Sequence, residues 1–86
     1  MKLLGRKLLE PLRGLDAETD RWLDSWASEL TRATWKALPD VRQQFPKAFI
    51  DKEGIYRFRV AARQEQIEVG FSFPLGIAII NGLRND

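Results

Sequence analysis

The chain has 86 residues, enough for one small domain with its own hydrophobic core. It contains no cysteine and no histidine, which excludes disulfide bonds, thiolate nucleophiles and imidazole groups acting as metal ligands or general bases. The net charge is +2, and no apolar run is long enough to cross a bilayer. We therefore expect a single cytoplasmic domain spanning residues 1–86, with no cofactor and no metal ion.

The charges are segregated along the chain. Residues 1–15 carry four basic side chains and one acidic, and residues 36–63 carry seven basic and three acidic. Residues 16–29, between them, carry five acidic side chains and one basic. An acidic helix between two basic segments predicts a molecule with two electrically different faces.

The N-terminal third is expected to be mainly helical. Residues 2–5 could form a short strand or begin a helix, whereas residues 6–12, "RKLLEPL", favour a helix ending near Pro11. Asp16 is a suitable N-cap for the next helix, and acidic residues follow it in the first turn. We expect that helix to span residues 17–36.

The long helix carries an apolar stripe at helical spacing. Its members are Trp22, Trp26, Leu30 and Ala33, widened by Leu23 and Ala27. Such a stripe most often faces a core, so both tryptophans are expected to be buried. The predicted core contains Trp22, Trp26, Trp35, Phe58, Val69 and Phe71.

The remainder of the chain predicts one short helix and then strands. The helix lies between Pro39 and Pro46. Residues 56–62 and 66–73 alternate apolar and polar side chains, and residues 77–83 are apolar on both faces, as in a central strand. This order predicts an α+β domain in which N-terminal helices pack on one face of a small antiparallel sheet. Its C-terminal meander has three strands, to which a short N-terminal strand could be added.

The stretch "IYRFRVAAR", residues 55–63, has an unusual outward face. Alternation turns Tyr56, Phe58, Val60 and Ala62 inward and leaves Arg57, Arg59 and Arg63 outward. Guanidinium groups bind phosphates through paired hydrogen bonds and stack on bases, so this face suits a nucleic-acid backbone. The alternative is that Arg59 pairs with Glu68 across the strands and that the other arginines are solvated.

Four segments in chain order resemble the HigB branch of the RelE/ParE superfamily of toxins. They are "MKLLGRKLLEPL", the helix end "RATWK", the segment "PDVRQQFPKA" and the strand "YRFRV". The resemblance implies a curved sheet with helices on one side. It also implies a ribosome-dependent endoribonuclease that cuts mRNA by activating the 2′-hydroxyl before the scissile phosphate, and that a helical antitoxin neutralises.

The resemblance suggests roles for particular residues of this chain. RNA would be held by Arg57, Arg59, Lys52 and Lys47. The catalytic candidates are Arg63, Arg84, Tyr56 and Glu65, of which Tyr56 and Glu65 are the acid–base candidates and Arg84 would stabilise charge on the phosphate.

The pattern departs from the family after Val60. Gln66 stands where the family has a strand arginine, and Arg84, Asn85 and Asp86 stand where it has Thr-His, an acidic residue and Tyr. Two alternatives to an active toxin therefore stay open. One is a catalytically inactive binding module of this fold, and the other is a phage or mobile-element inhibitor that contacts RNA or a protein.

Overall fold

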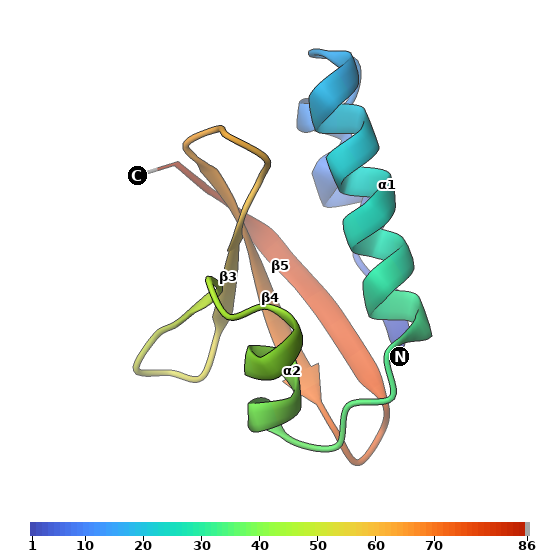
Figure 1. Cartoon of the computed structure of the whole chain (residues 1–86), viewed down its shortest axis with the longest axis vertical. Helices are drawn as coiled ribbons and strands as arrows, with labels where there is room; N and C mark the ends of the chain where they lie inside the picture. Colours follow the sequence, from blue (N-terminus) through green and yellow to red (C-terminus); the bar gives the residue numbers. More distant parts are fainter. Residues whose placement is uncertain (86) are drawn as a thin grey trace.

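The computed structural model describes residues 1–85 and leaves Asp86 outside the described residues. Five strands form one mixed sheet, with helices packed against one of its faces (Figure 1). The helical segments are η1 (Arg6–Leu12), α1 (Ala17–Arg32) and α2 (Leu38–Gln44). The strands are β1 (Lys2–Leu4), β2 (Phe49–Ile50), β3 (Tyr56–Arg59), β4 (Glu65–Ser72) and β5 (Ile77–Asn85).

The strand order across the sheet is β1-β5-β4-β3-β2. Strands β3, β4 and β5 form the predicted antiparallel meander. The sheet is nevertheless mixed, because β1 pairs with β5 in parallel, and β2 adds an edge strand that was not predicted. A parallel pair needs a long connection, which the helices and the other three strands supply here. The predicted α+β class is thus confirmed, with two strands added to the meander.

Strand β3 ends earlier than predicted, at Arg59 instead of Ala62. Ala61 has φ +50°, and the Arg63 N–H donates to the Val60 carbonyl oxygen at 2.9 Å, so the chain turns there. The turn exposes Ala62, which was expected inside. It also removes Arg63 from the sheet.

Helix α1 starts where predicted and ends four residues early. Asp16 caps it by accepting a hydrogen bond from the Thr19 N–H at 2.7 Å. Hydrogen bonds from the Thr19 backbone and hydroxyl hold the pKa of Asp16 below its ordinary value. At the other end the Met1 ammonium donates to the carbonyl oxygens of Thr31 (3.1 Å) and Ala33 (2.7 Å). A cation at the C-terminus of a helix is stabilised by the helix dipole, and the chain beyond can turn Trp35 into the core.

The predicted helix over residues 6–12 is a 3₁₀ helix that includes Pro11. It begins after Gly5, which has φ +88°. A Cβ atom at Gly5 would lie 2.7 Å from the Ile80 carbonyl oxygen, so only glycine allows β1 to turn this closely against β5.

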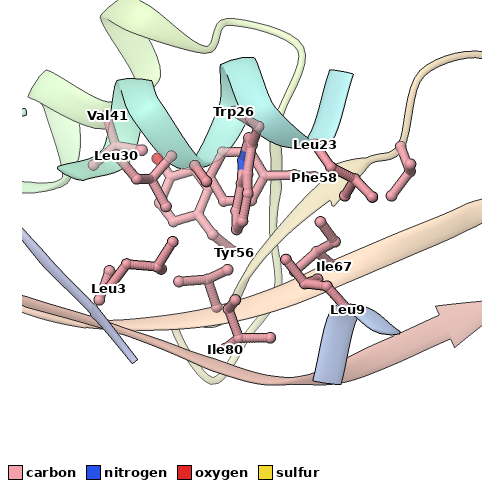
Figure 2. Close-up of a cluster of buried hydrophobic side chains, with 14 of the residues drawn as sticks. Leu3, Leu9, Leu23, Trp26, Leu30, Val41, Tyr56, Phe58, Ile67 and Ile80 are labelled. Atoms are coloured by element: carbon pink, nitrogen blue, oxygen red, sulfur yellow. The ribbon is translucent and has the colours of Figure 1, made fainter. Parts of the chain in front are cut away.

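The hydrophobic core lies between the helices and the sheet (Figure 2). The Trp26 ring stacks on Trp22 at a centroid distance of 6.0 Å and meets Phe58 edge-on at 5.5 Å. Four of the six predicted core residues are buried, namely Trp26, Trp35, Phe58 and Val69. The other two, Trp22 and Phe71, are only partly buried and pack against that core.

Within residues 1–85, none of the helices is both long enough and apolar enough to cross a membrane.

Candidate nucleic-acid interface

The sheet face turned away from the helices carries two of the four predicted RNA-binding residues, Arg57 and Arg59. The strand register aligns Arg59, Gln66 and Arg84 in one row across β3, β4 and β5. The next row contains Phe49 of β2, Arg57 of β3 and Glu68 of β4. We call this surface the outer face and define it by Phe49, Arg57, Arg59, Gln66, Glu68 and Arg84.

Arg57 is held by two carboxylates. Its Nη2 lies 3.3 Å from Asp51 Oδ2 and its Nε lies 3.3 Å from Glu68 Oε2, and its side chain is only 16% exposed. The alternative in which Arg59 pairs with Glu68 is wrong, because the register places Arg57 opposite Glu68 and Arg59 opposite Gln66. Arg57 therefore contributes a fixed, largely neutralised guanidinium.

The Asp51 carboxylate organises the loop between β2 and β3. Its Oδ1 accepts hydrogen bonds from the backbone N–H groups of Glu53 (2.9 Å) and Ile55 (3.0 Å). The bond from Ile55 is the main reason that the pKa of Asp51 lies below its ordinary value, and the Arg57 charge lowers that pKa further. Asp51 is therefore an anion at neutral pH and acts as an anchor for Arg57.

Arg59 and Arg84 present the more accessible guanidinium groups of the outer face. Arg59 is exposed and donates from Nη1 to the Arg63 carbonyl oxygen at 3.3 Å. The Arg84 side chain is 47% exposed, with Nη1 at 3.9 Å from Glu68 Oε2. Neighbouring strands lie about 4.8 Å apart, so the Cα atoms of Arg59 and Arg84, on either side of Gln66, are separated by about 10 Å. Two accessible cations at this spacing can contact one extended phosphate backbone.

The two predicted lysines lie at hollows beside these arginines. Lys47 borders a shallow groove of about 340 Å³, which is lined by Lys47, Phe49, Arg57, Arg59 and Gln66. Lys52 borders a second hollow of about 500 Å³, together with Arg57, Glu68 and Arg84. Three acidic side chains line that second hollow, namely Asp51, Glu53 and Glu68, so the groove beside Lys47 is the more basic of the two.

The structure does not bring the four catalytic candidates together. Tyr56 is 1% exposed, and its hydroxyl donates to the Leu38 carbonyl oxygen at 3.4 Å within the core. Its inward position on β3 therefore removes Tyr56 from any chemistry on the outer face. Of the four, only Arg84 lies on that face.

Arg63 and Glu65 form a separate pair on the helix side of the sheet. The Arg63 Nε and Nη2 each lie 3.1 Å from one oxygen of Glu65, and Nη1 reaches the Asp16 carboxylate at 3.4 Å. The hydrogen bonds from Arg63 hold the pKa of Glu65 below its ordinary value, so this carboxylate is a weak proton acceptor. The pair ties the β3–β4 turn to the start of α1.

Phe49 is a member of the outer face that the sequence pattern did not single out. Its side chain is 59% exposed, and the Arg57 Cζ lies 5.9 Å from its ring centroid. Strand β2 has two residues, too few to show an alternating pattern. The one available signal was a large aromatic residue next to Lys47 and Ala48 in a loop-like segment.

A larger hollow of about 680 Å³ lies between α1 and the segment that follows α2. Its walls include the aromatic side chains of Trp22, Trp26, Phe45 and Phe58. Its lining also contains Glu29 and, shared with the groove beside Phe49, Lys47 and Arg59. The Trp26 Nε1–H is buried and has no hydrogen-bond partner among the residues that the structure describes. This hollow is thus more apolar than the outer face and lies on the helix side of the sheet.

The described part of the chain contains no cluster of three acidic, histidine or cysteine side chains able to hold a metal ion. In comparisons with known proteins, no family model matches the chain and no curated protein matches it.

Proposed function

We propose that this chain is a HigB-type toxin of the RelE/ParE superfamily that binds single-stranded mRNA on its outer face. The observation that carries the proposal is the row of Arg59, Gln66 and Arg84 across three adjacent strands. The order of the four family-like sequence segments and the α+β architecture, with helices on one side of the sheet, support it.

The row of Arg59, Gln66 and Arg84 suits an RNA cleavage in which the nucleophile is a 2′-hydroxyl of the RNA itself. In the proposed reaction, the 2′-hydroxyl oxygen of one nucleotide attacks the adjacent phosphorus and the bond to the next 5′-oxygen breaks. The products are a 2′,3′-cyclic phosphate and a 5′-hydroxyl, because the 2′-hydroxyl loses its proton and the leaving 5′-oxygen gains one, which balances the reaction without a cofactor. Arg84 and Arg59 would stabilise the negative charge that develops on the non-bridging oxygens.

A second candidate function is RNA binding without cleavage. It is favoured by the state of the acid–base groups, since Tyr56 is buried and Glu65 is paired with Arg63. On the outer face, the Glu68 carboxylate is engaged by Arg57 at 3.3 Å. A protein with these features would inhibit translation by occupying RNA or the ribosome.

The partners in this proposal are mRNA on the ribosome and a helical antitoxin encoded beside the toxin. Neither requires a cofactor, a metal ion or a membrane. A phage or mobile-element inhibitor acting on another protein is the outcome that remains if RNA is not a partner.

The test is induced expression in a bacterium, with growth followed and mRNA ends mapped by primer extension. The informative variant is Arg59→Ala with Arg84→Ala, which removes both accessible guanidinium groups and leaves the Arg57 ion pairs in place. The control is Arg21→Ala with Arg42→Ala, which removes two exposed arginines from α1 and α2. We expect growth arrest and discrete cuts with the wild type and the control, and neither with the outer-face variant.

The outcomes separate the candidates. Growth arrest without cuts would support binding without cleavage. Normal growth and intact mRNA, from a folded wild-type protein at good yield, would contradict both the nuclease and the translation inhibitor.

A further inference from the structure

We propose that Phe49 is a stacking platform for one unpaired base of the RNA, with Lys47 and Arg59 holding the phosphates on either side of that nucleotide. The inference rests on the proposed function and names the nucleotide-binding subsite within it. No other residue of the outer face offers an aromatic ring.

The position of Phe49 is unusual for a large apolar side chain. It lies on the edge strand β2, opposite Arg57 in the register, and points to the face away from the core. With 59% of the side chain exposed, the ring is among the most accessible apolar groups of the described chain. Stacking an unpaired base would remove that apolar surface from water.

The ring is oriented by Arg57. The Arg57 guanidinium carbon lies 5.9 Å from the ring centroid, within the range of a cation–π interaction. Arg57 is itself fixed by Asp51 and Glu68, each at 3.3 Å. Because this chain of contacts orders the ring before RNA arrives, little side-chain entropy is lost when a base stacks on it.

The groove beside the ring has the remaining parts of a nucleotide site. Lys47, Arg59 and Gln66 line the same hollow of about 340 Å³ as Phe49 and Arg57. The two cations match a phosphate backbone, and the Gln66 amide can donate to and accept from a base edge. Within residues 1–85 no acidic side chain lines this groove, in contrast to the hollow beside Lys52.

These features favour single-stranded RNA over an apolar protein segment. A hydrophobic partner would bury Lys47 and Arg59 without neutralising them, which is unfavourable. A base with its flanking phosphates satisfies the ring and both cations at once. A duplex would not fit, because its bases are stacked on one another and are not available to the ring.

The experiment measures the affinity of the full chain for a short, fluorescently labelled single-stranded RNA by anisotropy, at several low salt concentrations. The variants are Phe49→Ala, Phe49→Leu and Phe49→Trp. The matched control is Leu75→Ala, which removes a 72% exposed apolar side chain from the turn between β4 and β5. Circular dichroism establishes that each variant is folded.

Phe49→Ala should weaken binding by about 5- to 150-fold, the range reported for loss of one base–aromatic stack. Phe49→Leu should resemble Phe49→Ala, because leucine has no π-face, and Phe49→Trp should bind at least as tightly as the wild type. The dependence of the RNA affinity on salt concentration should be unchanged by Phe49→Ala and reduced by Arg59→Ala, which removes a phosphate contact. Leu75→Ala should bind like the wild type.

A set of RNAs, each with one abasic nucleotide at a different position, locates the stacked base. The RNA that lacks the stacked base should bind the wild type and Phe49→Ala with equal affinity, because the base that would contact Phe49 is missing. If the wild type binds RNA and Phe49→Ala or Phe49→Leu binds it equally well, the stacking subsite is wrong and the proposed function stands. If the wild type binds no single-stranded RNA at low salt, both fail.

Discussion

Replacement of Trp26 by alanine is the most severe test of the core. The side chain is 1% exposed and contacts Trp22 and Phe58 through its ring. Burying a tryptophan removes about 150–250 Å² from water, which corresponds to about 4–6 kcal/mol of transfer free energy. The buried Nε1–H without a partner offsets about 1–3 kcal/mol of this. The difference is about 1–5 kcal/mol, and the cavity that alanine leaves behind adds to it, so we expect Trp26→Ala to cost about 3–5 kcal/mol, in line with other buried aromatics.

That loss is large for this chain. A domain of 86 residues is expected to have an unfolding free energy of about 4–13 kcal/mol. The melting temperature should therefore fall by about 12–40 °C, as measured by circular dichroism during thermal and urea unfolding. Trp26→Phe should cost about half as much, because phenylalanine refills part of the cavity and removes the unpaired N–H.

The control is Trp22→Ala, at the neighbouring position of the same helix face. Trp22 is only partly buried, so its removal should cost clearly less than that of Trp26. A loss below about 1 kcal/mol for Trp26→Ala would refute the reasoning, because no fully buried aromatic is removed so cheaply. The ring would then belong to a surface in solution.

Three further predictions concern the backbone, the helix cap and the turn. Gly5→Ala should destabilise the fold more than Gly14→Ala. Both glycines have positive φ, which costs a residue with a Cβ atom about 1–2 kcal/mol, but only at Gly5 would the new Cβ clash with a backbone oxygen, at 2.7 Å. Equal losses of unfolding free energy, measured in urea, would contradict this. The pKa of Asp16 is lowered in the folded state, so its stabilisation is complete above the unfolded value of 3.8 and is lost as the pH falls through the folded value. The difference in melting temperature between the wild type and Asp16→Ala should accordingly be full at neutral pH and shrink below pH 3.8, and a difference that grew on acidification would be inconsistent with the cap. Arg63→Ala and Glu65→Gln should leave RNA affinity unchanged, because these side chains pair with each other on the helix side, and a marked loss in the binding assay would return them to the site.

Much of the architecture was predictable because its signals are local. The apolar stripe of α1 and its Asp16 cap lie within one helix, and the alternation of β4 lies within one strand. The early end of α1 was not predictable, because the Met1 ammonium that meets its last carbonyl groups is about thirty positions away in the sequence. The edge strand β2 was missed because two residues show no period.

The candidate site was predictable only in outline. Alternation placed Arg57 and Arg59 on the outer face, but register decides which arginine meets Glu68, and register depends on the turn between β3 and β4. The positive φ of Ala61 tightened that turn and took Arg63 out of the face. Of the three arginines that the alternation singled out, Arg57 is fixed by ion pairs, Arg59 is exposed on the outer face and Arg63 lies off that face. Arg84, from β5, joins Arg59 in the same row across the sheet.

The central claim is that RNA binds the outer face, and amide and side-chain chemical shifts in an NMR titration with short single-stranded RNA test it most directly. We expect the largest shifts on β2 to β5 at Phe49, Arg59, Gln66 and Arg84, and no response from the acidic surface of α1. Shifts concentrated instead at Trp22, Trp26 and Phe45, in the apolar hollow between α1 and the segment that follows α2, or no shifts at low salt, would contradict the claim.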